Sequence, residues 1–157
     1  MENEGCKIKG EVIVEELVPG TDIVKSREVG ENIICAGGAI ALAQCLVIGG
    51  AITPTPFNWM ILSTGTTAVS RATTAIEATR TSSSAAVTPT RVGSVITWVN
   101  TYPAVPAGGA GASPIWKFGM ENSTAGSGYV LNEYMFSASK DNRNNDVKVT
   151  YNLSIAP

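Results

Sequence analysis

Apolar and polar residues alternate in short runs along the chain, and the first run predicts a β-hairpin. Residues 7–18 (KIKGEVIVEELV) place apolar side chains at alternate positions, and Pro19-Gly20 then supplies a turn. Residues 22–34 follow the turn and form the natural partner strand. With acids on one face and Ile and Val on the other, this hairpin is expected to belong to a sheet with one solvated face.

Five further runs have the β-branched and aromatic content of strands. The segments are Asn58–Ser63, Arg91–Thr101, Ile115–Met120, Tyr129–Ala138 and Val147–Ile155. The last two flank the polar loop Ser139–Asp146, a pattern typical of a second hairpin. For residues 64–90, which are rich in Thr, Ser and Ala, the pattern leaves irregular strands and a long surface excursion equally open.

One apolar run predicts a helix. Residues 33–52 contain a single polar side chain, Gln44, and are long enough to cross a membrane. We interpret the run instead as a short buried helix near residues 37–49, because glycine pairs interrupt it and no Lys or Arg flanks it. A Pro- and Gly-rich loop is expected at residues 102–114.

Together these elements predict one domain over residues 1–157, with residues 1–6 as an N-terminal arm. Seven or more short strands with one helix, and no alternation of strand with helix, indicate a mainly β protein with an antiparallel β-sandwich fold. The acidic start of the chain (Met1, Glu2, Glu4) lacks the pattern of a secretory signal, so the expected site of synthesis is a cytoplasm.

Charge and composition argue against several classes of function. The 157 residues contain 13 acids, 11 bases and no His, which gives a net charge of −2. Such a balance offers no excess of cations to nucleic acid. Without His, the chain lacks the commonest general base and metal ligand, so we expect no enzyme activity, cofactor or metal site.

The charges are unevenly placed. Eight of the 13 acids precede residue 32, whereas residues 32–116 carry only Arg71, Glu77, Arg80 and Arg91 as charged side chains. Two explanations remain open for the charge-poor stretch: a surface of Thr, Ser and Gly, or burial against neighbouring molecules in an assembly.

Three sets of residues are candidates for a catalytic, metal-binding or sugar-binding site. Glu121 and Glu133 could face each other as a hydrolase pair, although solvated edge acids are the simpler interpretation. The loop Asp141–Asp146 could hold Ca²⁺, but an Asn/Asp turn is favoured. The three tryptophans could form a sugar-stacking platform, with core packing favoured; they are Trp59, Trp98 and Trp116.

Cys6, Cys35 and Cys45 are expected to be buried free thiols, with a Cys6–Cys35 disulfide or a reactive thiol as the alternatives.

Several segments follow one another along about residues 30–156. They are Asn32-Ile-Ile with Gly37-Gly-Ala-Ile-Ala-Leu-Ala, Ile61-Leu-Ser-Thr-Gly-Thr-Thr, Ala75-Ile-Glu-Ala-Thr-Arg80, Ile115-Trp-Lys-Phe-Gly-Met, Gly128-Tyr-Val-Leu-Asn-Glu-Tyr-Met-Phe-Ser and Val147-Lys-Val-Thr-Tyr-Asn-Leu-Ser-Ile. In their order, these segments resemble the small structural proteins of tailed bacteriophages, both capsid decoration (cement) proteins and tail-associated β-sandwich proteins. Two positions depart from the usual pattern, with Lys117 in place of an acid and Ser63 in place of Gly.

The resemblance implies a non-enzymatic component of the virion that binds other virion proteins. Capsid decoration, in which the chain would bind and stabilise the shell of major capsid protein, is the leading expectation, with homo-oligomers and no membrane or nucleic-acid partner. A tail or baseplate subunit and a carbohydrate-binding or adhesin module are the alternatives. The arm and the long loop are the expected docking elements, through Glu2, Glu4, Lys7, Tyr102, Pro103, Val105, Pro106 and Pro114.

Overall fold

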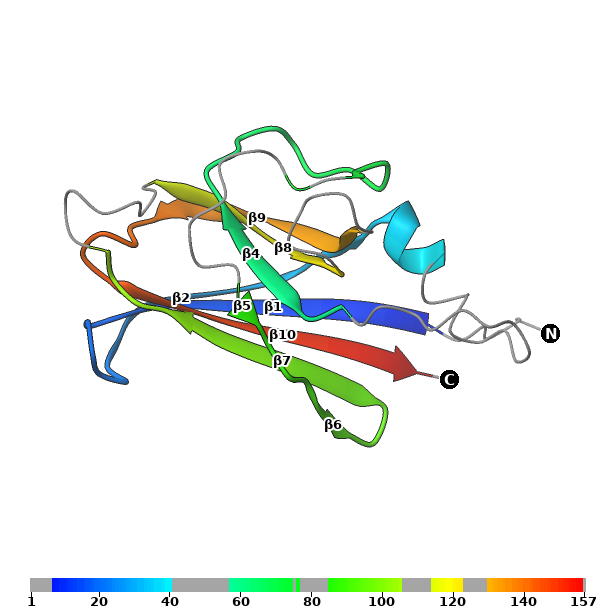
Figure 1. The fold of residues 1–157 in the computed structure, drawn as a ribbon, viewed down its shortest axis with the longest axis horizontal. Coiled ribbons are helices and arrows are strands. Elements are labelled where there is room, and N and C mark those ends of the chain that lie inside the picture. The colour runs from blue at the N-terminus through cyan, green and yellow to red at the C-terminus, as the bar shows by residue number, and fades with distance from the viewer. Residues whose placement is uncertain are drawn as a thin grey trace.

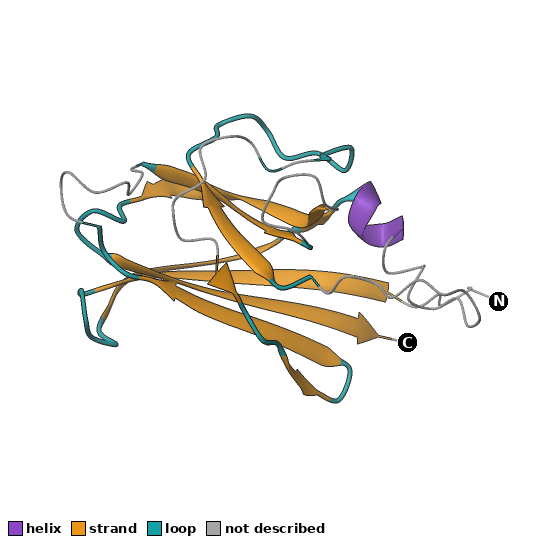
Figure 2. Ribbon diagram, viewed as in Figure 1, coloured by secondary structure: helices purple, strands orange, loops and turns teal. Residues whose placement is uncertain are grey.

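Two β-sheets lie face to face in the computed structural model (Figures 1 and 2). The structure describes residues 7–40, 57–74, 76, 85–105, 114–122 and 130–156. Every strand pair in this part of the chain is antiparallel, which confirms the predicted β-sandwich.

The first sheet, sheet A, joins the beginning of the chain to its end. Its strand order is β2-β1-β10-β7-β6. The strands are β1 (Lys7–Leu17), β2 (Val24–Glu31), β6 (Thr90–Val92), β7 (Val95–Tyr102) and β10 (Asp146–Ala156). β1 pairs with β10 along its whole length, from Lys7 opposite Ala156 to Leu17 opposite Asp146. The predicted β1–β2 hairpin is confirmed.

The second sheet, sheet B, has the strand order β3-β9-β8-β4-β5. Its strands are β3 (Ile33–Ile34), β4 (Trp59–Ser63), β5 (Ala85–Ala86), β8 (Ile115–Glu121) and β9 (Val130–Lys140). The register between β8 and β9 shifts at two places, between Ile115 and Lys117 and between Met120 and Glu121. The four predicted strands over residues 58–63, 91–101, 115–120 and 129–138 correspond to β4, β6 with β7, β8 and β9.

Both long edges of the sandwich are crossed by a segment that passes from one sheet to the other. Along one edge, residues 24–31 pair in sheet A and residues 33–34 pair in sheet B. Along the other edge, residues 85–86 pair in sheet B and residues 90–92 pair in sheet A. These crossings hold the two sheets together at their sides, as in sandwiches whose strands switch sheets at corners.

The core lies between the sheets and is built from alternate residues of the long strands. Sheet A contributes Val12, Val14, Trp98, Tyr151 and Leu153, all buried. Trp98 stacks on Tyr151 with ring centroids 5.4 Å apart and donates its indole N–H to the carbonyl oxygen of Phe57 at 2.9 Å. Sheet B supplies the facing residues, which include Met60, Leu62, Phe118, Met120, Leu131 and Phe136.

The predicted hairpin between residues 129–138 and 147–155 is wrong. β9 pairs with β3 and β8 in sheet B, whereas β10 pairs with β1 and β7 in sheet A. The polar segment between them therefore connects the two sheets. β9 and β10 are both amphipathic, and each buries its apolar side chains against the opposite sheet. Although they follow one another in sequence, they therefore do not pair with each other.

The predicted helix begins at residue 36, and residues 36–40 are helical. Gly38 is buried there because it lies on the backbone of Leu131: a β-carbon at position 38 would come within 2.6 Å of the Leu131 Cα. Ile40 is 53% exposed, so this first turn is buried only in part. Residues 41–49 of the predicted helix lie outside the described residues. The described part of the chain contains no helix with the length and apolar character needed to cross a bilayer.

Candidate functional site

The residues expected to dock on a partner are spread over the molecule. Lys7 is exposed at the start of β1, Pro103 and Pro114 are exposed in the long connection between β7 and β8, and Val105 is half-buried. Glu2, Glu4 and Pro106 lie outside the described residues. The remaining residue, Tyr102, is fully buried.

Tyr102 therefore belongs to the core and not to a docking surface. Its side chain is 0% exposed, and this burial raises the pKa of its phenol. The prediction that Tyr102 is a docking residue is wrong. Tyr102 is the last residue of β7, and at the boundary between a strand and a loop the sequence does not show which residues are buried. In register, Tyr102 lies opposite Val147, at the far end of sheet A from Lys7. The structure thus separates the start of β1 from the long connection.

The first residues of the long connection are held against the segment that joins β9 to β10. The buried Asn142 side chain donates to the carbonyl oxygens of Tyr102 and Pro103 at 3.1 and 3.2 Å. The Asp146 carboxylate accepts from the backbone N–H of Ala104 at 2.7 Å and from that of Gly20 at 2.9 Å. One carboxylate therefore joins three segments, and this part of the loop is a fixed joint.

The candidate calcium loop has the geometry of an Asn/Asp turn. The Asp141 carboxylate accepts from the backbone N–H of Arg143 at 2.9 Å and from the Asn144 side chain at 2.7 Å. The Glu16 carboxylate accepts the backbone N–H of Asp141 at 2.9 Å. These bonds match the turn interpretation, in which side chains satisfy the loop's own backbone.

Glu121 and Glu133 lie on neighbouring strands of sheet B, as the sequence allowed. Glu133 is opposite Gly119, two residues from Glu121 along β8. Both are buried, with exposed fractions of 0% and 2%. Glu121 accepts the backbone N–H of Ile76 at 3.1 Å, and Glu133 accepts the Thr73 hydroxyl at 2.8 Å. The two carboxylates thus anchor the segment around residues 73–76 to sheet B, which is a structural use of both groups.

The two departures from the phage pattern are neighbours in space. Ser63 on β4 lies directly opposite Lys117 on β8, and both side chains are buried. Their positions on separate strands, about fifty residues apart in sequence, concealed this pairing from sequence patterns. The two side chains that depart from the phage pattern therefore face each other across the β4–β8 ladder.

The tryptophans and the described cysteine belong mostly to the interior. Trp98 is buried, and Trp59 and Trp116 are half-buried, so core packing is confirmed for Trp98. Cys35 is a free, buried thiol, as predicted, and burial together with the nearby Glu133 charge raises its pKa to about 11. At neutral pH this thiol is protonated and therefore a poor nucleophile. Cys6 and Cys45 lie outside the described residues.

A buried ion pair that the sequence did not reveal joins the two sheets near one edge. The Lys140 ammonium group of β9 is 2.8 Å from the Glu28 carboxylate of β2, and their side chains are 7% and 11% exposed. The same carboxylate accepts the Tyr134 hydroxyl and the Ser137 backbone N–H, each at 2.7 Å. Burial alone would raise the pKa of Glu28, but these donors and the Lys140 charge together hold it below its ordinary value.

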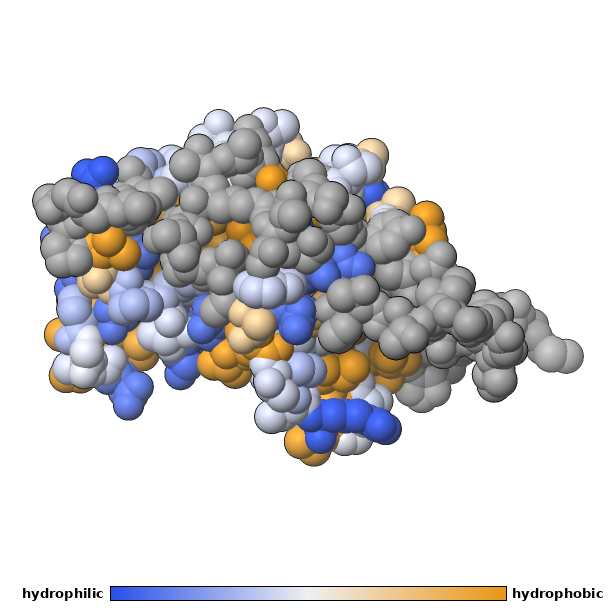
Figure 3. All heavy atoms as spheres, viewed as in Figure 1, coloured by the Kyte–Doolittle hydropathy of each residue, from blue (hydrophilic) through white to orange (hydrophobic). Residues whose placement is uncertain are grey.

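The outer face of sheet A changes in character from one side to the other. On β7 it presents Val95, Thr97, Val99 and Thr101, without a charge, whereas β1 and β2 present a network of charges. Glu15 is 3.7 Å from both Arg27 and Lys148. Apolar and strongly hydrophilic residues meet at the bottom of the view in Figure 3, where the β6–β7 hairpin lies.

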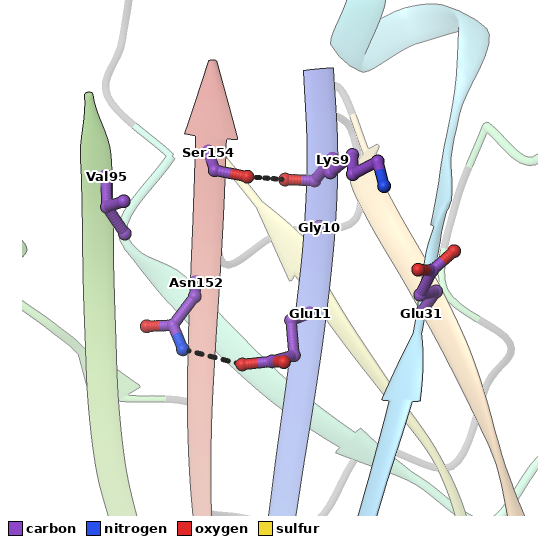
Figure 4. Close-up of a pocket in the computed structure, with 7 residues that line it drawn as sticks. All are labelled: Lys9, Gly10, Glu11, Glu31, Val95, Asn152 and Ser154. Atoms are coloured by element: carbon purple, nitrogen blue, oxygen red, sulfur yellow. Dashed lines mark hydrogen bonds between the residues drawn. The ribbon is translucent and has the colours of Figure 1, made fainter. Parts of the chain in front are cut away.

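A shallow hollow of about 450 Å³ lies on this outer face (Figure 4). Asn152 on its floor donates to Glu11 at 3.0 Å, and Ser154 donates to the Lys9 carbonyl oxygen at 3.4 Å. Glu31 lies directly opposite Glu11 in the β1–β2 register. Figure 4 shows the two carboxylates pointing apart, that of Glu11 toward Asn152 and that of Glu31 away from β1.

No protein-family model, curated protein or solved structure matches this chain.

Proposed function

We propose that this chain is a non-enzymatic structural protein of a tailed-bacteriophage particle, where it decorates and stabilises the shell of major capsid protein. The order of sequence segments over about residues 30–156 supports this proposal, and so does the antiparallel sandwich that those segments build. In this function the chain works by binding its neighbours, and no group of the protein has to react.

The observation that carries the proposal is the charge-poor outer surface of β6 and β7. From Thr90 to Tyr102 the only charged residue is Arg91. Two aliphatic side chains are exposed there, Val92 by 80% and Val99 by 44%. Aliphatic and hydroxyl side chains with few ions are the composition of the buried centre of a lasting protein interface.

The environment of the reactive groups also favours a binding role. Glu121 and Glu133 are engaged by Ile76 and Thr73, and the Cys35 thiol has a raised pKa. A hydrolase would instead need one carboxylic acid and one carboxylate that are both accessible to substrate.

Two other functions make different demands on the surface. A tail or baseplate subunit would use the same charge-poor surface in far fewer copies. A carbohydrate-binding module would need exposed aromatic rings on one face, and Trp98 is buried beneath Tyr151 and Phe57. The buried position of Trp98 therefore favours the capsid proposal over the sugar-binding alternative.

Mass spectrometry of purified particles of the virus that encodes this chain tests the proposal. Capsid decoration predicts hundreds of copies per particle. A dozen copies or fewer would place the chain in the tail, and absence from the particle would overturn a virion role altogether.

Variants then test the docking surface. Val99→Glu places a charge at the centre of the charge-poor surface, so binding to capsid shells stripped of this protein should fall at least tenfold in a pelleting assay. Ile23→Glu is the matched control, because Ile23 is 63% exposed in the β1–β2 turn, away from β7. Equal binding by the two variants would contradict this choice of surface.

A further inference from the structure

The outer edge of β2 has backbone groups available for pairing. β2 is the terminal strand of sheet A, and no described strand pairs with its other side. The backbone N–H of Asn32 donates to Gly10 at 3.1 Å, which identifies Gly10 and Asn32 as a hydrogen-bonded pair. In an antiparallel ladder such pairs alternate, so Arg27, Val29 and Glu31 direct their N–H and C=O groups away from β1.

The side chains along the outer edge of β2 are self-complementary about a two-fold axis that passes through Val29. A second β2 strand related by a two-fold axis through Val29 would run antiparallel to the first. Val29 would then lie opposite Val29 of the second copy, and Arg27 would lie opposite Glu31 of the second copy at each end. On the inner face, Glu28 would meet Gly30, which has no side chain to collide with it. Isologous dimers require this kind of self-complementarity.

Such pairing would also provide partners for two side chains of the single chain, Glu31 and Val29. Glu31 lies opposite Glu11 in the register, with its carboxylate directed away from that of Glu11 (Figure 4), and has no ion-pair partner among the described residues. Val29 is 52% exposed and lies beside Ile13 on the outer face. A second copy would bring an Arg27 guanidinium to each Glu31 and would cover each Val29.

Charged edge strands often prevent association, but here the order of charges selects one alignment. Moving the two-fold axis by two residues, from Val29 to Arg27, would place Arg27 opposite Arg27 of the second copy, whereas the alignment through Val29 pairs opposite charges. We propose that a second copy of this chain binds along β2, joining two copies of sheet A into one continuous sheet. This inference does not depend on the proposed virion function.

A charge-swap series measured by sedimentation equilibrium of the full chain tests the interface. Arg27→Glu or Glu31→Arg alone puts like charges opposite each other at both ends, so the dimer dissociation constant should rise about tenfold or more. The double variant Arg27→Glu/Glu31→Arg should recover most of this loss. Raising the salt concentration should weaken the parent dimer, because exposed ion pairs are screened.

The Glu31→Arg variant separates association from folding. Its new cation lies opposite Glu11 on the same chain, so the urea midpoint of the monomer should rise while the dimer weakens. Thr90→Glu, on the exposed opposite edge of sheet A, is the matched control and should leave association unchanged.

Disulfide cross-linking of cysteine variants tests the proposed alignment of the two β2 strands. Val29→Cys should form a disulfide-linked dimer under mild oxidation, because directly opposite residues are about 5.5 Å apart at Cα. Arg27→Cys should not, and the parent chain gives the background from the native cysteines. A chain that remains monomeric at millimolar concentration, dimers insensitive to the charge swaps, or a Thr90→Glu effect equal to theirs would overturn the proposal.

Discussion

At the scale of single residues, Glu28 is the clearest case of a side chain whose removal should matter. Glu28→Gln keeps the size of the group but leaves the buried Lys140 ammonium without its counterion. We expect a loss of about 2 kcal/mol or more in the free energy of unfolding at neutral pH, measured by urea denaturation. Glu15→Gln is the control, because its ion pairs are longer, at 3.7 Å, and more exposed, so it should cost less than about 1 kcal/mol.

The same variant should change the pH dependence of stability. The pKa of Glu28 in the folded protein lies below the ordinary value of 4.5. Its contribution is therefore complete above pH 4.5 and is lost as the pH falls through the folded value. The stability difference between the parent and Glu28→Gln should shrink on acidification below pH 4.5, and a difference that stayed constant down to pH 2 would contradict this assignment.

Gly38 is needed for a close approach between the helix start and β9. Alanine normally stabilises a helix relative to glycine by about 1 kcal/mol. Here the added β-carbon would lie 2.6 Å from backbone atoms of Leu131, which cannot rotate away. Gly38→Ala should therefore destabilise the protein by about 1–3 kcal/mol in urea denaturation.

Gly93 provides the control for Gly38. Its φ is +59°, and a β-carbon there would meet no atom within 4 Å. Since asparagine adopts this backbone conformation readily, Gly93→Asn should change the stability little. If Gly38→Ala were as neutral as Gly93→Asn, the helix start would not be packed on β9 as described.

Residue patterns could not reveal contacts of this kind. Gly30, for example, makes room for the Tyr134 ring, and a β-carbon at position 30 would collide with it. The two residues are about a hundred positions apart, and nothing near either one in sequence shows that they meet. Glu28 likewise resembled any solvated acid of a wet strand, because its partner Lys140 lies on the other sheet.

At the scale of elements, local patterns found most strands but not their partners. The β1–β2 hairpin was predictable because Pro19-Gly20 forces a reversal within a few residues. The position of β10 between β1 and β7 was not, since Lys7 pairs with Ala156 at the other end of the chain. The same limit applies to the candidate site: Glu133 lay inside a predicted strand and Glu121 directly after one, but their hydrogen bonds to residues 73 and 76 were not predictable.

The joint between the β1–β2 turn and the long connection after β7 depends on Asp146 at the start of β10. Asp146→Ala removes an acceptor from the backbone N–H groups of Gly20 and Ala104. We expect a loss of about 2–4 kcal/mol, because two hydrogen bonds to a charged group are broken. Hydrogen exchange should accelerate first at these two amides. Asp22→Ala, an exposed change in the same β1–β2 turn, should leave both the stability and the exchange rates nearly unchanged.

At the scale of the whole molecule, the sandwich should unfold as one unit. The segments that cross its two edges each pair with both sheets, and β1 pairs with β10 at opposite ends of the chain. The facing side chains of the two sheets also form one core, so opening either sheet would expose the apolar face of the other. Such mutual dependence is the physical basis of a cooperative, two-state transition.

Fluorescence of single-tryptophan variants measures this cooperativity. A variant that retains Trp98 reports on sheet A, and one that retains Trp59 reports on sheet B. Because phenylalanine replaces a different pair of tryptophans in each variant, their stabilities will differ, so each fluorescence transition is compared with the circular dichroism of the same variant. In both variants the two urea curves should coincide in midpoint and slope. A Trp59 transition that preceded the loss of circular dichroism would mean that sheet B opens alone, and the edge crossings would then not couple the sheets.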